Sequence, residues 1–136
     1  MSIFSCARAA CLLVTAAMAV MAGEASANVT AFSAHSLQVK HEVNTSVPEA
    51  KVYQALLGQV GAWWNPAHTY TKDAKNLSIE ARPGGCFCEK FPEGGGIEHL
   101  RVVYLMPNQA VRFSGGLGPF QPNGVAGSLS FNIVPI

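Results

Sequence analysis

Three side chains of this sequence could carry acid–base chemistry, namely His41, Glu89 and His99. A histidine titrates near neutral pH, and a carboxylate in contact with it fixes its tautomer, so such a pair can move a proton at a bound molecule. If the strands predicted at 86–91 and 97–106 form a hairpin, Glu89 lies opposite His99. The pair is then either an acid/base site, if its face of the sheet lines a cavity, or an exposed ion pair.

His41 lies in a segment, 37–44, where apolar and polar residues alternate as in a half-buried strand. The alternation places His41 on the same face as Leu37, Val39 and Val43. There it would either contact a ligand oxygen and act as an acid or base, or hydrogen-bond to a backbone carbonyl in the core.

Cys86 and Cys88 are the two cysteines that remain once Cys6 and Cys11 leave with an N-terminal signal. On a regular strand their Cα atoms would lie about 6.6 Å apart. A disulfide needs Cβ atoms about 3.5–4.5 Å apart, so we expect no bond between them. Two ligands are too few for a structural zinc, and no metal or cofactor is expected. Buried core thiols are the expectation, with an intermolecular or redox role, or a metal, as alternatives.

The N-terminal residues 1–27 have the pattern of a signal peptide. Arg8 precedes an apolar run of ten residues at 12–21, and Ala25, Ser26 and Ala27 supply the small residues of a cleavage site. The run is shorter than the roughly 20 residues that cross a bilayer, and no cysteine follows it to carry a lipid. We expect cleavage near Ala27 and a periplasmic or secreted product with no stable membrane anchor. A buried N-terminal helix is the alternative.

Composition limits the class of partner. Of 136 residues, 12% are charged, and 9 Lys and Arg against 8 Asp and Glu give a net charge of +1. That balance is too small for the basic surface that phosphate-backbone binding needs, so no nucleic-acid partner is expected. The length is that of one domain.

The elements that would position these side chains begin after a predicted flexible leader at 28–36. A strand is predicted at 37–44, and Ser46 with Glu49 is typical of a capping box that opens a helix. Glycines at 58 and 61 predict that the helix breaks into two short pieces, and the second piece ends at 64–66, where the chain reads Trp-Asn-Pro.

Residues typical of turns then separate a series of predicted strands. Because the turns are short, we expect these strands to be antiparallel. The predicted strands are 76–81, 86–91, 97–106, 110–114 and 125–134. Gly115–Gly124 is rich in Gly and Pro, and Pro119 and Pro122 predict a stiff surface loop. It is not a phosphate loop, because no Lys-Ser/Thr follows it. The expected fold class is α+β, with two short helices after the first strand.

This order of elements resembles the START-like (SRPBCC) superfamily, in particular its polyketide-cyclase-like and chaperone-ATPase-activator-like branch. The motifs are Val-Pro-Glu-Ala-Lys-Val-Tyr-Gln-Ala-Leu at 47–56, Trp-Trp-Asn-Pro at 63–66 and Arg-Pro-Gly-Gly at 82–85, within a similarity that covers about 37–135. The resemblance implies a helix-grip fold, in which a curved antiparallel sheet grips a long C-terminal helix and an apolar pocket lies between them.

Members of that superfamily end with a further strand and a long amphipathic helix, whereas this chain ends at Ile136 in a predicted strand. We therefore expect 37–136 to be an incomplete START-like domain that lacks its C-terminal helix. Apolar sheet left in water would forgo about 25 cal/mol per Å². A molten or self-associating chain is expected.

The hairpin register that pairs Glu89 with His99 also places Lys90 opposite Glu98. The more apolar face of the hairpin is predicted to line the pocket, and it carries Cys86, Cys88, Leu100, Val102, Tyr104 and Met106. Phe87 and Phe91 then lie on the outer face. His68 and Tyr70 either fold over the mouth of the pocket or are solvated loop residues.

The predicted function is that of an exported protein that holds a small apolar or amphipathic molecule, such as a lipid, a polyketide or an aromatic metabolite. The predicted ligand-binding residues are Trp63, Trp64, His41, Cys88, Leu100, Tyr104, Phe113 and Phe131. A cyclase- or hydrolase-type enzyme that uses the same pocket is one alternative, and a protein-interaction domain is another.

Overall fold

The computed structural model describes residues 26–33 and 35–136, and the chain divides into two compact units, Met1–Thr45 and Ser46–Ile136. Most of the predicted signal peptide lies outside the described residues. Within the described ranges no helix combines the length and the apolar character that a membrane span requires.

In the first unit, β1 (Ser26–Phe32) and β2 (Leu37–Glu42) form an antiparallel hairpin, with Val29 opposite Val39. The prediction of a flexible leader at 28–36 is therefore wrong over most of its length, because the backbone of this segment pairs with β2. All six residues of β2 are exposed. The predicted inward position of His41 is also wrong, and its side chain faces solvent within this unit.

The second unit begins with the two predicted short helices. They are α1 (Glu49–Gly58) and α2 (Val60–Trp63). The predicted capping box is absent: α1 has Pro48 at its N-cap and no side-chain cap, and the backbone N–H groups of Lys51 and Val52 donate to the Pro48 carbonyl instead. Proline suits this position because a residue before the first helical turn has no backbone N–H to donate within the helix.

Gly61 in α2 is expected to be hard to replace, whereas Gly58 at the end of α1 is not. A Cβ atom on Gly61 would lie 2.8 Å from the carbonyl oxygen of Ala74, but one on Gly58 would meet nothing within 4 Å. Gly61→Ala should therefore destabilise the fold by about 1–3 kcal/mol, and Gly58→Ala should be neutral or stabilise it by up to about 1 kcal/mol. Urea unfolding of both variants measures the difference, and equal stabilities would contradict it.

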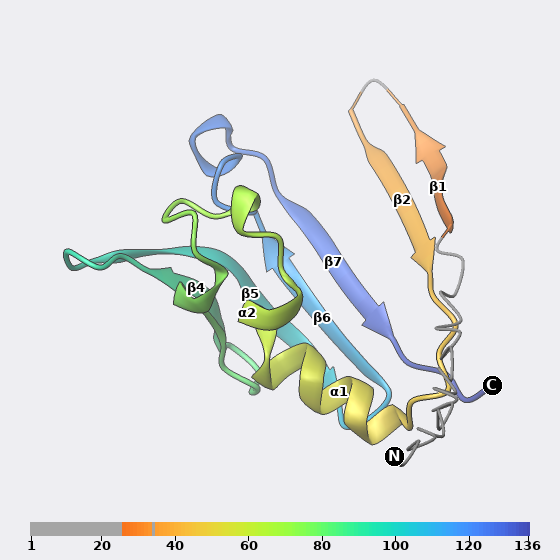
Figure 1. Ribbon diagram of the computed structural model, residues 1–136. Coiled ribbons are helices and arrows are strands. Elements are labelled where there is room, and N and C mark those ends of the chain that lie inside the picture. Colours follow the sequence, from red (N-terminus) through yellow and green to blue (C-terminus); the bar gives the residue numbers. More distant parts are fainter. Residues whose placement is uncertain (1–25, 34) are drawn as a thin grey trace, which may run out of the picture. The chain divides into compact units, whose positions relative to one another are not determined.

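A five-stranded antiparallel sheet follows, with strand order β3-β4-β5-β6-β7. Its strands are β3 (Leu77–Ile79), β4 (Cys86–Lys90), β5 (Gly96–Met106), β6 (Ala110–Gly115) and β7 (Gly127–Asn132). Three short 3-10 helices lie in the connections, at Pro66–His68 (η1), Ala74–Asn76 (η2) and Gln121–Asn123 (η3). The predicted α+β class and the five predicted strands are confirmed. Within this unit, Figure 1 shows α1 and α2 lying over one face of the sheet.

β5 contains two irregularities that change which side chains share a face. Phe87 pairs with Leu100 but Cys88 pairs with Glu98, so His99 is an extra residue in the ladder. A second shift falls further along, between Val102 and Tyr104. The predicted pairs are therefore wrong by two positions, since Glu89 lies opposite Ile97 and Lys90 opposite Gly96. Each bulge moves the residues beyond it to the other face of the strand.

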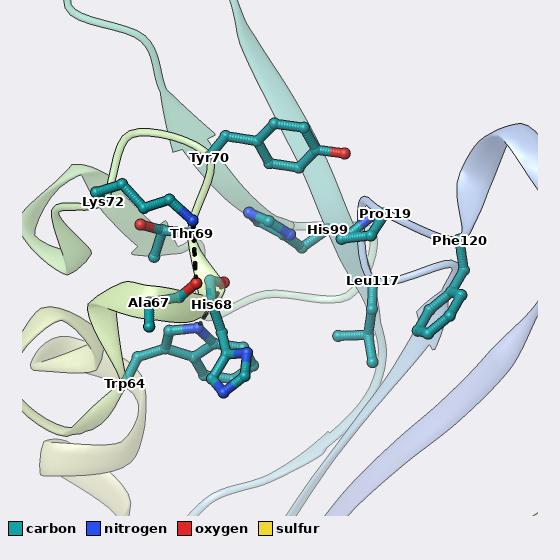
Figure 2. A pocket seen from close by; sticks show the side chains of 10 residues that line it. All are labelled: Trp64, Ala67, His68, Thr69, Tyr70, Lys72, His99, Leu117, Pro119 and Phe120. Atoms are coloured by element: carbon teal, nitrogen blue, oxygen red, sulfur yellow. Dashed lines mark hydrogen bonds between the residues drawn. The ribbon is translucent and has the colours of Figure 1, made fainter.

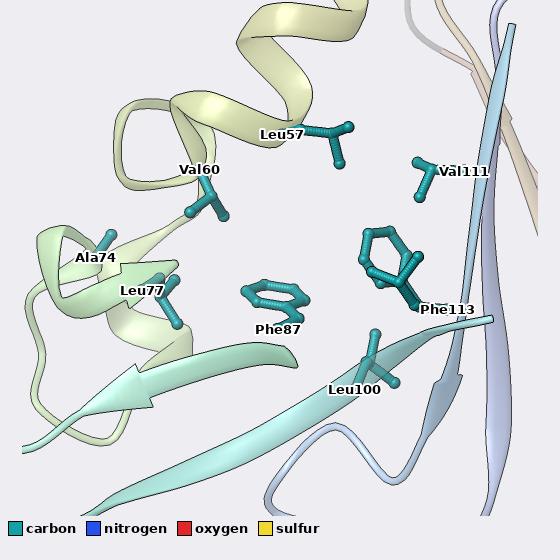
Figure 3. Packing of buried hydrophobic residues seen from close by; sticks show 9 residues of the cluster. Leu57, Val60, Ala74, Leu77, Phe87, Leu100, Val111 and Phe113 are labelled. Carbon is teal, nitrogen blue, oxygen red and sulfur yellow. The ribbon is translucent and has the colours of Figure 1, made fainter. Parts of the chain in front are cut away.

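The core lies between the helices and the sheet face that carries Phe87. Its buried apolar residues are Leu57, Val60, Ala74, Leu77, Phe87, Leu100, Val102, Val111 and Phe113. Figure 3 shows Leu57 and Val60 of the helices directed towards Phe87 and Phe113 of the sheet. The predicted face assignment is therefore wrong for β4, because Phe87 is buried and the two cysteines are not in the core. Tyr104 and Met106, also predicted to face inwards, are 41% and 40% exposed.

Cys86 and Cys88 form a disulfide, against the prediction that they stay apart. Their Cα atoms are 5.3 Å apart, which is within the usual range for a disulfide and shorter than the spacing of a regular strand. The prediction assumed the spacing of a regular strand, and β4 is shorter than that between these two residues, beside the shift in its pairing with β5.

Candidate functional site

A cavity of about 520 Å³ opens in the second unit, between the segment after α2, β5 and the loop that joins β6 to β7. Its volume lies within the range of small-molecule sites, about 300–1,000 Å³. The lining residues, shown in Figure 2, are Trp64, Ala67, His68, Thr69, Tyr70, Lys72, His99, Leu117, Pro119 and Phe120. Most of the lining is apolar or aromatic, and His99 and Lys72 bring polar groups to it.

His99 is held at the cavity by a buried carboxylate. Its Nε2 atom lies 2.9 Å from Oε2 of Glu89, and the two residues are only 3% and 1% exposed. The β5 bulge places His99 on the core side, where it meets Glu89 although the two are not cross-strand partners. The predicted exposed ion pair is therefore wrong, because both side chains are buried beside the cavity, and an acid/base role for the pair stays a prediction.

Glu89 also accepts two backbone hydrogen bonds from the segment that forms the opposite wall of the cavity. The N–H of Tyr70 donates to Oε2 at 3.0 Å, and the N–H of Thr71 donates to Oε1 at 2.6 Å. Burial acts to raise the pKa of the Glu89 carboxyl, but the hydrogen bonds from Thr71, Tyr70 and His99 outweigh it, and the net pKa lies below the ordinary value. Glu89 therefore stays ionised and orients the His99 ring.

At three positions around the cavity the backbone has a positive φ, a conformation that residues other than glycine rarely adopt. Lys72 and Leu117, both in the lining, have φ of 59° and 47°. Gly118 has φ of 60°, and a Cβ atom there would lie 2.9 Å from Nδ1 of His99 and 3.0 Å from Cε2 of Tyr70. Only glycine lets the loop approach the histidine this closely. Strained backbone of this kind concentrates at functional sites.

Aromatic rings form the walls and connect them to the core. Trp64 packs edge-on against Phe87 with ring centroids 5.2 Å apart, and its Nε1 donates to the carbonyl oxygen of His68 at 3.2 Å. Tyr70 lies 6.2 Å from the His99 ring. These contacts fix the orientation of the walls, so the cavity is preformed rather than assembled by a ligand.

Of the predicted site residues, the structure brings Trp64, His99 and Glu89 together at this cavity. Leu100 and Phe113 are buried in the core, and Phe131 packs against Trp63 with ring centroids 6.0 Å apart. The other predicted ligand-binding residues lie elsewhere: Tyr104 is exposed on β5, Cys88 is in the disulfide, and His41 is exposed in the unit 1–45.

The loop 115–124 was predicted to be a surface loop, and its contribution to the cavity was missed. Leu117, Pro119 and Phe120 of this loop line one wall. A signal was present in the sequence, because loops often carry binding residues and this one contains a leucine and a phenylalanine. His68 and Tyr70 were predicted either to fold over the mouth of a pocket or to be solvated loop residues, and both line this cavity.

No family model, no curated protein and no solved structure matches this chain. The cavity and the buried Glu89–His99 pair are therefore the observations on which a function can be based.

Proposed function

We propose that this chain is an exported protein that binds a small, largely aromatic molecule with one polar group. The preformed cavity with His99 fixed at its wall carries the proposal. Trp64, Tyr70 and Phe120 offer flat apolar surface to a ring. His99 and Lys72 offer hydrogen-bonding partners to a hydroxyl, carbonyl or acid group.

We further propose a START-like, helix-grip domain for the second unit. Two short helices that cover one face of an antiparallel sheet, with a cavity beside them, support that assignment. A signal peptide removed near Ala27 remains part of the proposal. N-terminal sequencing of the protein recovered from the producing cell tests it, and an intact Met1 would contradict it.

1-Naphthol is a suitable probe because it combines a planar apolar ring system with one hydroxyl. We expect saturable, single-site binding of 1-naphthol in calorimetric titration. Phe120→Ala should weaken binding about fivefold, since the ring at 120 lines the cavity and removing it exposes the ligand to water. The fold should not change, because Phe120 is 51% exposed and lies outside the core.

Tyr104→Ala is the matched control. Tyr104 is an aromatic residue of similar exposure, at 41%, and it does not line the cavity. Its replacement should leave 1-naphthol binding unchanged. A lack of saturation in the parent chain, or equal affinities for the two variants, would overturn the binding proposal.

A general acid–base enzyme is the second candidate, because a buried carboxylate orients a histidine at the cavity. Nε2 of His99 faces Glu89, and Nδ1 lies on the side of Gly118. A histidine oriented in this way can take a proton from water or from a hydroxyl group. In that case the pocket would position an ester or a similar acyl compound beside the ring.

Hydrolysis of 1-naphthyl acetate separates the two candidates. An enzyme should release 1-naphthol and acetate, and His99→Gln should lower the rate by about 100-fold or more while 1-naphthol binding persists. A carrier should not exceed the buffer rate, and His99→Gln should then alter affinity only. Urea unfolding of the variant checks that it is folded before either result is interpreted.

A further inference from the structure

The Cys86–Cys88 disulfide lies on the sheet face that points away from the core. Phe87, between the two cysteines, is buried on the opposite face together with Glu89. Both cysteines are half-buried, and neither lines the cavity described above. An external thiol can therefore approach the sulfur atoms without entering the core.

This disulfide is expected to stabilise the fold only slightly. Its cysteines are separated by two positions in the sequence, so the bond closes a very short loop. Disulfides stabilise mainly by restricting the unfolded chain, and the effect grows with the length of the closed loop. β4 is in addition already paired on both edges, with β3 and β5. Structural stability alone gives little reason for a bond here.

Charged side chains lie beside Cys86. Sγ of Cys86 lies 3.9 Å from Oε2 of Glu98, and the Arg101 guanidinium pairs with that carboxylate. On the other side, a carboxylate oxygen of Glu80 lies 3.4 Å from the backbone nitrogen of Cys86 and forms an ion pair with Arg82. A carboxylate in contact with Sγ can accept the S–H of a reduced cysteine, and the nearby guanidinium limits charge repulsion.

We propose that Cys86–Cys88 is a redox-active disulfide that exchanges with dithiols. A thiolate of the external dithiol attacks one sulfur, the Cys86–Cys88 bond breaks, and a mixed disulfide forms. The second thiolate of the dithiol attacks the mixed disulfide, so the dithiol is oxidised to its own disulfide. Both cysteines are reduced by the same two electrons and take up the two protons that the dithiol loses. Glu98 is the positioning residue that accepts the S–H of Cys86.

The strand geometry favours the reverse reaction as well. The two Cα atoms are 5.3 Å apart in the disulfide, and backbone pairing with β3 and β5 limits how far they can separate when the sulfurs are reduced. The two thiols therefore stay close after reduction, and a disulfide reagent can reoxidise them without rearrangement of the sheet.

Dithiothreitol is the probe that tests this proposal on the full chain. After timed exposure, free thiols are alkylated and the protein is digested with trypsin. Cleavage after Lys75 and Lys90 gives the peptide 76–90, which carries Cys86 and Cys88 and excludes Cys6 and Cys11; the bond between Arg82 and Pro83 within it resists trypsin. We expect reduction of the folded chain at a rate within about tenfold of the rate in denaturant, and urea stabilities of the oxidised and reduced chains that are nearly equal.

Three results would overturn the proposal. Reduction that is more than about 100-fold slower in the folded chain would make the disulfide a protected structural bond. Loss of the folded state on reduction would show that the disulfide is a structural bond that the fold requires. Protection of both reduced thiols from alkylation by Zn²⁺ alone would indicate a metal site, since the ligand atoms of Cys86, Cys88 and Glu98 lie within 4.8 Å of one another. Cys86→Ser is the control, because Cys88 then has no partner within the peptide. This variant should show one alkylated thiol in the peptide both before and after exposure to dithiothreitol.

Discussion

Glu89→Gln is expected to lower the free energy of unfolding by about 3–5 kcal/mol, because it removes a buried carboxylate and leaves the donors around it without their charged acceptor. The Glu89 side chain is only 1% exposed and accepts hydrogen bonds from Tyr70, Thr71 and His99. An amide has one oxygen and directs its NH₂ group towards one of these donors, so at least one buried contact becomes unfavourable. Urea unfolding at about pH 7, followed by circular dichroism, measures the loss.

The same carboxylate makes stability depend on pH. The pKa of Glu89 in the folded chain lies below its ordinary value of 4.5, so its contribution is fully present above 4.5. The contribution is lost as the pH falls through the lower folded-state pKa. The difference in unfolding free energy between the parent chain and Glu89→Gln should therefore shrink as the pH falls below 4.5.

Glu93→Gln is the control for both measurements. Glu93 is an exposed glutamate in the β4–β5 turn, so the same chemical change there should leave stability within about 0.5 kcal/mol of the parent chain. If Glu89→Gln and Glu93→Gln have equal stabilities, the buried pair does not stabilise the fold, and the orienting role given to Glu89 is wrong.

The sequence allows the element order to be predicted because that order depends on local signals. Apolar spacing and the glycine at 58 locate the two helices, and the glycines and prolines at 83–85 and 92–96 delimit β4. Each signal acts over a few residues and does not need the rest of the fold. The α+β class followed from them.

The assignment of faces failed because it assumed regular alternation along β5. The bulge at His99 places both His99 and Leu100 on the buried side. Strict alternation would separate them and would group Leu100 with the cysteines of β4. A bulge is set by the strands that pair and by the packing beneath them, so the pattern of one strand does not reveal it. The disulfide was missed because the Cα spacing of a regular strand was assumed for β4, and the Cα atoms of Cys86 and Cys88 lie closer, at 5.3 Å.

The candidate site was only partly predictable, because its walls come from segments that are distant in sequence. Trp64 and His99 could be chosen by residue type, but nothing local indicates that Leu117 and Phe120 face them. Gly118 makes that approach possible through its positive φ and its missing Cβ. Both properties depend on the tertiary contact with His99 rather than on the loop sequence alone.

Phe87→Ala is expected to destabilise the second unit by about 3–5 kcal/mol, as truncations of buried phenylalanines do. Phe87 is 1% exposed, and its ring lies 5.2 Å from Trp64, 5.7 Å from His99 and 5.9 Å from Phe113 between ring centroids. Its removal leaves a void against both the core and the cavity. Since domains are stable by only about 5–15 kcal/mol, urea unfolding should show a large loss.

Phe87→Leu separates packing from ring contacts. Leucine refills most of the volume, so this variant should recover at least half of the stability lost in Phe87→Ala. It cannot restore the edge-on contact with Trp64 or the contact with His99, and 1-naphthol binding should stay weaker than in the parent chain. Phe120→Ala serves as the reverse control, with weakened binding and unchanged stability. If Phe87→Leu binds 1-naphthol as the parent chain does, the ring at 87 fills the core without holding the cavity walls in place.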